Sequence, residues 1–319
     1  MAATTDFITA QRVNRRNTLL LLVILTGVAA LVGYVVGWAL EGEASDSVPL
    51  WSKVGVLLAG LMAVASVGWS LISLAFGDSL VLSMANAKAI EKADAPQLYN
   101  VVEEMAIAAG VPMPRVMIME TDALNAFATG NRIGHGTIVV TRGLLDTMNR
   151  EELQGVVAHE MSHLANLDTR YMVVVGVTVG LIALVCDMLL RTMAWGSSGS
   201  SSSNSSGKKS SGGGLLIILL IVVAIFAPLA AKAVQMAVSR QREYLADATS
   251  VQFTRNPNGL ISALGKLADK AAPFPGVSRA TQHLFIVNPV QTFTAKTPAL
   301  LATHPDIADR IARLRNLGS

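Results

Sequence analysis

Four long apolar segments constrain this chain more than any other feature of its sequence. A helix needs about 20 apolar residues to cross the hydrocarbon core of a bilayer, and residues 18–40, 50–76, 171–190 and 215–238 all reach that length. Only 15% of the residues are charged, whereas a soluble domain carries about 25%. We therefore expect a mostly α-helical membrane protein with four transmembrane helices.

The third segment is the weakest of the four candidates, because Asp187 lies near its end. Lys232 lies in the last turns of the fourth, where its ammonium group can extend to the membrane surface. The alternative is that these two segments form a buried helical pair in a soluble core. Apolar runs of this length favour membrane spans.

The flanking charges predict the orientation in the membrane. Arg12, Arg15 and Arg16 precede the first segment, and basic residues concentrate on the cytoplasmic side. The loop at 41–47 has acidic residues and no basic one, which suits the outer face. Because the first segment exceeds the 7–15 apolar residues of a cleaved signal, we interpret it as an uncleaved anchor. We expect a multi-pass protein of the cell (inner or plasma) membrane with both termini in the cytoplasm.

This topology divides the chain into four parts. Residues 1–76 hold the N-terminal tail and two spans, and residues 171–238 form a hairpin whose Ser/Gly-rich loop, 197–214, has the composition of a flexible linker. Lys208 and Lys209 in that loop would face outward, against the positive-inside rule. Residues 77–170 and 239–319 form one cytoplasmic domain in two pieces.

Composition excludes two other classes of protein. The net charge is only +3, and the basic residues form no stripe with interleaved aromatics, so we expect no nucleic-acid partner. The single cysteine, Cys186, rules out an intramolecular disulfide.

The first soluble piece has a mixed local pattern. Residues 95–109 have the apolar spacing of a helix, which Gly110 and the prolines after it end. Residues 115–120 and 136–141 are apolar and rich in β-branched residues, as in strands. A further helix begins at Asn149, which can cap it together with Glu152.

This last helix carries His159-Glu160-Met-Ser-His163. Residues four apart lie on one face of a helix, so His159 and His163 can point at one ion with Glu160 beside an open coordination position. Imidazole and carboxylate groups are ligands that zinc accepts, and the pattern is that of metalloproteases with a glutamate general base. The alternative is a surface helix that happens to carry two histidines.

A third ligand must come from elsewhere in the chain. Glu243 and Asp247 lie four residues apart in a helical pattern after the fourth segment. We assign Glu243 to the metal and Asp247 to a hydrogen bond with one of the ligand histidines. The residues alone equally allow both carboxylates to pair with Arg240 and Arg242 on a solvated face.

A second histidine motif lies near the C-terminus. His304 precedes Pro305, which can begin a helix, and Arg310 follows one to two turns later. An imidazole and a cation close together could stabilise an oxyanion. On the sequence alone, a capping threonine followed by a surface histidine is the favoured alternative.

Taken together, these motifs resemble those of the HtpX family of membrane-bound, heat-shock-associated metallopeptidases, which is related to the CAAX-prenyl endopeptidases. The resemblance covers nearly the whole chain except the 197–214 loop. It rests on four sequences: Asn125-Ala-Phe-Ala, His159-Glu-Met-Ser-His-Leu-Ala-Asn-Leu-Asp, Ser239-Arg-Gln-Arg-Glu-Tyr-Leu-Ala-Asp and Thr303-His-Pro-Asp.

The resemblance implies a helical zincin-type metallopeptidase domain with a small β-sheet and one zinc ion, with Glu243 as the third ligand. It also implies an edge strand at Asn125, Ala126 and Phe127 that holds the substrate backbone by strand addition. It places His304 and Arg310 near the scissile carbonyl. The substrates it implies are polypeptides, mainly misfolded membrane proteins, so the implied role is quality control during stress.

The expected chemistry is attack by a zinc-activated water, with Glu160 as general base and then acid. Three alternatives remain: a prenyl-protein endopeptidase, an intramembrane protease and a non-catalytic membrane scaffold. The charged residues flanking the His-Glu motif argue for a site in water, and an intact Glu160 argues against a scaffold.

Overall fold

The computed structural model describes most of the chain, and the chain divides into two units. One unit comprises Met1–Thr18, Ser73–Val177 and Val234–Ser319, and the other comprises Leu19–Ile72 and Thr178–Ala233. The described residues are 7–44, 51–132, 134–175, 240–269 and 305–317.

The Leu19–Ile72 unit contains most of two helices, α1 (Phe7–Ala44) and α2 (Lys53–Met84), which pack against each other there. A Cβ atom added at Gly37 would lie 2.6 Å from the Gly55 Cα, so only glycine permits this approach. Thr26 and Ser66 add a hydroxyl contact of 3.3 Å between the helices. Small residues at a close contact are typical of helices that associate in membranes.

Both helices are long and apolar enough to cross a membrane, with mean hydropathies of 2.7 and 2.0. Large apolar side chains such as Leu19, Val23 and Val64 are 60–73% exposed, which suits contact with lipid. Of the four predicted spans, these are the two that the structure describes. The third, after Val175, and the fourth lie outside the described residues, as does the 197–214 loop.

The other unit contains a mixed four-stranded sheet in the order β1-β2-β4-β3. β2 (Arg115–Met119) runs parallel to β4 (Thr137–Thr141), while β3 (Ala126–Thr129) is antiparallel to β4 and forms one edge. β1 (Lys88–Ala89) forms the other edge. Among the described strands, β3 therefore pairs on one side only.

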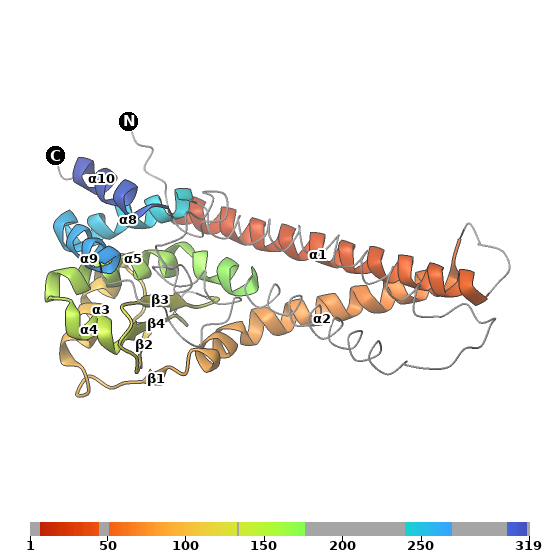
Figure 1. The fold of residues 1–319 in the computed structure, drawn as a ribbon, viewed down its shortest axis with the longest axis horizontal. Helices are drawn as coiled ribbons and strands as arrows, with labels where there is room; N and C mark the ends of the chain where they lie inside the picture. The colour runs from red at the N-terminus through yellow and green to blue at the C-terminus, as the bar shows by residue number, and fades with distance from the viewer. Residues whose placement is uncertain (1–6, 45–50, 133, 176–239, 270–304, 318–319) are drawn as a thin grey trace, which may run out of the picture. The chain divides into compact units, whose positions relative to one another are not determined.

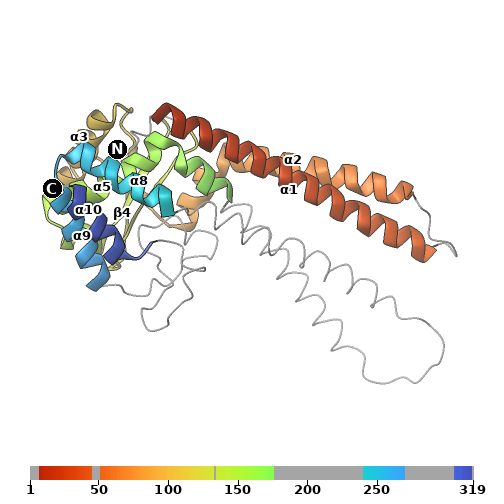
Figure 2. The ribbon, with the colours of Figure 1, turned by 90° about the horizontal axis from the view of Figure 1, so that it is seen from above.

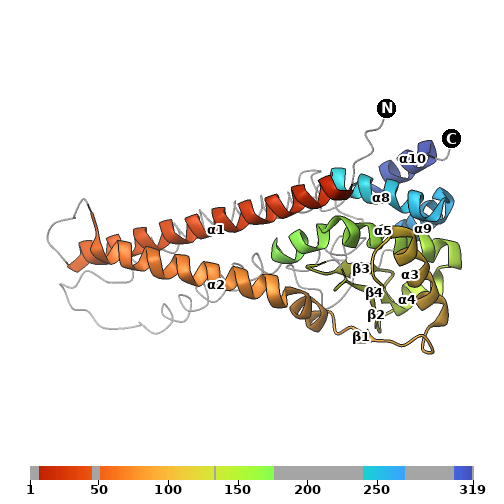
Figure 3. The same ribbon diagram turned by 180° about the vertical axis from the view of Figure 1, so that it is seen from behind.

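The helix α5 (Arg150–Asn166) runs through the centre of this unit (Figure 1) and is buried from Glu152 onward. On one side it meets β3 and β4, and on the other it packs on α8 (Arg240–Thr254) and α9 (Pro257–Asp269), as Figures 2 and 3 show. Contact with α9 is so close that a Cβ atom at Gly155 would lie 2.6 Å from the Leu260 nitrogen. The remaining helices are α3 (Pro96–Ala109), α4 (Arg142–Thr147) and α10 (Ile307–Leu317).

Several local predictions are confirmed. The predicted helix at 95–109 is α3, the two predicted strands are β2 and β4, and Asn149 and Glu152 form a complete capping box on α5. The second apolar segment does not end its helix at Phe76: α2 continues to Met84, because Val81 and Leu82 pack on Phe127 in a second apolar cluster.

Candidate metal centre

One turn of α5 brings two imidazoles together. The Nε2 atoms of His159 and His163 lie 3.3 Å apart, and the rings meet edge to face. Both side chains are buried, with exposures of 1% and 5%. The i, i+4 spacing therefore places both histidines at one point, as the sequence predicted.

A carboxylate from α8 faces the same point. The Glu243 oxygens lie 3.7 Å from His159 Nε2 and 3.8 Å from His163 Nε2, and the residue is 1% exposed. The three side chains form a group that could hold a metal ion. This burial excludes the alternative in which Glu243 lies on a solvated face.

The other ring nitrogen of each histidine meets an aspartate. His159 Nδ1 lies 3.0 Å from Asp247 Oδ1, and His163 Nδ1 lies 3.0 Å from Asp168 Oδ2. An ionised carboxylate only accepts hydrogen bonds, so each Nδ1 carries the donated proton and each Nε2 is the nitrogen left to bind a metal ion. Carboxylate–histidine pairs of this kind orient metal ligands and raise their basicity.

Zinc fits this set of donors. Two nitrogens bound to one tetrahedral zinc, each about 2.0–2.1 Å away, lie roughly 3.4 Å apart, and the observed separation is 3.3 Å. The charges around the site also suit a metal cation. Burial disfavours the charged form of His163, but Asp168 and Glu243 outweigh this effect and raise the pKa of His163 to about 9. The acidic surroundings thus favour a cation at this point.

Asp168 is a functional candidate whose role the sequence did not reveal. It lies five residues after His163, a spacing that a continuous helix would turn away from the His163 face. Leu167 ends α5 in the left-handed conformation, with φ of 58°. A non-glycine residue adopts this conformation only at some cost, and here the turn directs Asp168 back to His163.

Glu160 lies beside the edge strand. Its side chain is 3% exposed and accepts a hydrogen bond from the Ala128 backbone N–H on β3. Burial, with a further contribution from the charge of Glu243, raises its pKa to about 7. A carboxylate with a pKa near the working pH suits a general base that later returns the proton.

Arg310 on α10 is fully buried and binds Asp247 with two hydrogen bonds, of 2.7 and 2.9 Å. Its Nη2 lies 3.4 Å from His159 Nδ1, and its Nη1 lies 3.8 Å from Glu243 Oε2. The contact supports Asp247, which is 3% exposed, and the predicted role of Arg310 at the scissile carbonyl stays a prediction. His304, its predicted partner, lies outside the described residues.

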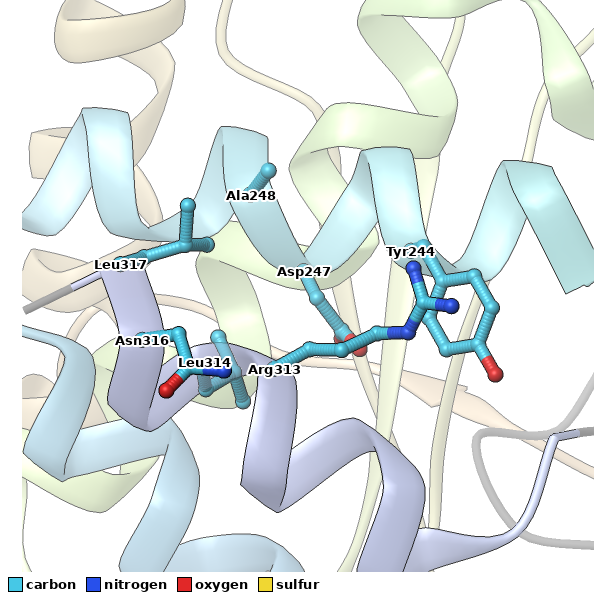
Figure 4. A pocket seen from close by; sticks show the side chains of 7 residues that line it. All are labelled: Tyr244, Asp247, Ala248, Arg313, Leu314, Asn316 and Leu317. Carbon is cyan, nitrogen blue, oxygen red and sulfur yellow. The ribbon is translucent and has the colours of Figure 1, made fainter. Parts of the chain in front are cut away.

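A small pocket of about 290 Å³ lies between α8 and α10, and Asp247 is one of the residues that line it. Figure 4 shows Arg313 of α10 against the Tyr244 ring of α8, at 3.8 Å from the ring centroid. Arg313 is exposed, unlike Arg310 three residues earlier on the same helix.

The three residues predicted to bind substrate lie at β3. Ala126 and Phe127 belong to this strand and are 1% exposed. Asn125 precedes the strand and fixes its start with two hydrogen bonds. The Asn125 N–H donates to Thr141 Oγ1 at 2.9 Å, and the Asn125 Oδ1 accepts from the Ala126 N–H at 3.0 Å. Ala128 of the same strand donates a hydrogen bond to Glu160, and the role of Asn125, Ala126 and Phe127 in substrate binding stays a prediction.

Comparison with known proteins decides the family. The model of Peptidase family M48 matches residues 92–318. Curated proteins called "Protease HtpX homolog" match almost end to end: that of Caldanaerobacter subterraneus is 40% identical over 96% of both chains, and that of Streptococcus agalactiae is 41% identical over 95% of this chain and 97% of its own.

The chain belongs to the HtpX proteases of peptidase family M48. Membership makes it a membrane-associated protease that acts on polypeptides. Among solved structures, the crystal structure of S. mikatae Ste24p is similar with a TM-score of 0.48 and 18% identity, covering 89% of this chain and 62% of that chain.

Proposed function

We propose that this HtpX protease is a zinc-dependent endopeptidase, anchored in the cell membrane by four helices, that removes misfolded membrane proteins. The observation that carries the chemistry is the buried His159, His163 and Glu243 group. Three protein ligands with one open position are the pattern of a catalytic zinc site. The quality-control role follows the family resemblance.

The proposed mechanism uses the chain's own residues around the metal. His159, His163 and Glu243 would hold a zinc ion, which would supply Lewis acidity and would lower the pKa of water from about 15.7 toward 7. Glu160 takes the proton of the attacking water on its carboxylate and then gives it to the leaving amine. Asp247 and Asp168 keep the histidine protons at Nδ1, and His304 assists at the developing oxyanion.

The substrate backbone adds to the edge of β3 that no described strand occupies. Strand addition binds the main chain and needs few side-chain pockets, which suits a protease with varied substrates. Glu160 receives a hydrogen bond from Ala128 on that strand. A peptide extending the sheet there would pass the general base.

Glu243→Ala is expected to lower the zinc content from about one ion per chain to a small fraction, because two histidines leave the ion without its third ligand. Metal analysis after dialysis measures the effect. Glu151→Ala, which removes an exposed carboxylate from α5, is the matched control and should keep its zinc. Full zinc occupancy in a folded Glu243→Ala protein would place the third ligand elsewhere.

The topology has its own test. His163 and Glu243 meet at one point, so an even number of membrane crossings must separate them. After Cys186→Ala, Ser45→Cys and Ser203→Cys should react with a membrane-impermeant thiol reagent in intact cells, whereas Ser278→Cys and Ser319→Cys should not.

Reaction at Ser278→Cys without lysis would invert the orientation. Protection at Ser203→Cys, with Ser45→Cys still reactive, would show that the third and fourth segments do not cross the membrane and belong to the soluble fold.

A further inference from the structure

Three segments that are far apart in the sequence are joined by hydrogen bonds just outside the predicted membrane spans. Asn14 of α1 donates a hydrogen bond of 2.7 Å to Asp168, and the hydroxyl of Thr169 donates one of 2.6 Å to the Gly130 carbonyl. The start of α1, the loop after β3 and the residues that follow α5 therefore form one local structure. All these residues belong to the same unit.

A cavity of about 470 Å³ opens in this structure, separate from the metal centre. The Asn131 side chain bonds the Leu74 carbonyl, which fixes the β3–β4 loop on the last part of α2. The lining is mainly polar and includes Asp78, Arg115, Asn131, Arg132 and His135.

Basic groups gather here without acidic partners. In the part of the chain that the structure describes, no carboxylate lies within ion-pair distance of Arg115 or Arg132 at the cavity, or of Arg15 and Arg170 nearby. The Arg170 Nε is buried and has no hydrogen-bond partner. Burial lowers the pKa of Arg170, and the charges of Arg15 and Arg132 lower it further, so these cations lie close enough to repel one another.

The two nearest carboxylates are already engaged. Asp78 accepts a hydrogen bond of 2.9 Å from Thr129; burial raises its pKa and the charge of Arg115 lowers it, so Asp78 can offset only one of the four arginines. Asp168 bonds His163 and Asn14. The cluster therefore has an excess of positive charge that the described residues leave without a counter-charge.

The position of the cluster along the chain indicates the source of an anion. Arg15 lies three residues before the first apolar segment begins, and Asp78 lies two residues after the second ends. Such positions lie at the level of the lipid headgroups. Arginine binds phosphate groups well, because its planar guanidinium offers paired donors.

We propose that Arg15, Arg115, Arg132 and Arg170 form a binding site for a phosphoryl group, supplied by the headgroup of an anionic phospholipid. The bound phosphate would offset the mutual repulsion of the arginines. It would also hold the loop after β3 against the end of α5. The site is independent of the zinc chemistry, and its test does not require an active protease.

The test measures binding to the full-length protein in a neutral detergent by microscale thermophoresis. The probes are short-chain phosphatidylglycerol, phosphatidylcholine of equal chain length, and inorganic phosphate. Phosphatidylglycerol should bind at least tenfold more tightly than phosphatidylcholine. Removing one surface arginine should weaken anionic lipid binding about fivefold, so Arg132→Gln/Arg170→Gln should weaken it roughly 25-fold.

The matched control, Arg255→Gln/Arg315→Gln, removes one exposed cation just after α8 and one on α10, and should leave the affinity unchanged. If the first double variant does not fold, Arg115→Gln/Arg132→Gln removes two exposed arginines and should show a similar loss. Unchanged affinity in the folded variants, or an equal loss in the control, would overturn the site. Inorganic phosphate that displaced the lipid at equal concentration would overturn the lipid as its occupant.

Discussion

The Glu160→Gln protein is expected to keep its zinc and to lose peptide hydrolysis by a factor of about 10²–10⁴ in kcat, the usual contribution of a general base. The amide has nearly the shape of the carboxylate but cannot accept the proton of water. Because Glu160 is not one of the three grouped ligand candidates, metal content should stay at that of the wild type. Cleavage of casein and metal analysis on the same sample measure both quantities.

Glu151→Gln is the matched control, since it makes the same change on the exposed face of α5. Its turnover should equal that of the wild type. A Glu160→Gln protein with turnover within a few-fold of the wild type would remove Glu160 from the proton transfer and leave the family chemistry to another group.

The second large effect is expected at Arg310. Arg310→Ala leaves Asp247 buried without its cation, and breaking a buried ion pair in this way costs about 3–5 kcal/mol. For a domain of this size that corresponds to a fall in Tm of roughly 6–20 °C. Zinc affinity should also fall by about 10–100-fold, as it does when a group supporting a ligand histidine is lost. Thermal unfolding and zinc titration measure the two effects.

Arg313→Ala controls for the loss of an arginine from α10, where the exposed side chain makes a cation–π contact with Tyr244. That contact is worth about 0.5–1 kcal/mol. If Arg310 and Asp247 act as a pair, the Arg310→Ala/Asp247→Ala protein should lose much less than the sum of the two single losses. An Arg310→Ala protein with wild-type Tm and zinc affinity but reduced kcat would instead favour a direct role at the oxyanion.

Local patterns predicted the parts of the site that lie on one helix. The i, i+4 spacing of His159 and His163 and the capping box at Asn149 are properties of a single stretch of sequence, and the structure contains both. The four-residue spacing placed Glu243 and Asp247 on one face of a helix. Because they lie far from α5 in the sequence, it was equally possible that this face is exposed to solvent. The packing of α8 on α5, which buries both carboxylates, decides between them.

Features that depend on a turn or on distant packing were not predictable in this way. Asp168 reaches His163 only because Leu167 breaks the helix. The two exposed residues of β1 carry no strand pattern, and α2 extends past Phe76 because Phe127 offers a surface for its last turns. Arg310 meets Asp247 from 63 positions away, so nothing in its own helix indicated the partner.

Joint measurement of zinc content and casein cleavage through chelation and re-addition tests the central claim most directly. The full-length protein in detergent is predicted to carry one zinc per chain, bound by His159, His163 and Glu243. Chelation should remove the metal and the activity together, and one equivalent of zinc should restore both. Cleavage that continues in the metal-free protein, or activity that stays absent after zinc has rebound to a folded chain, would contradict the account.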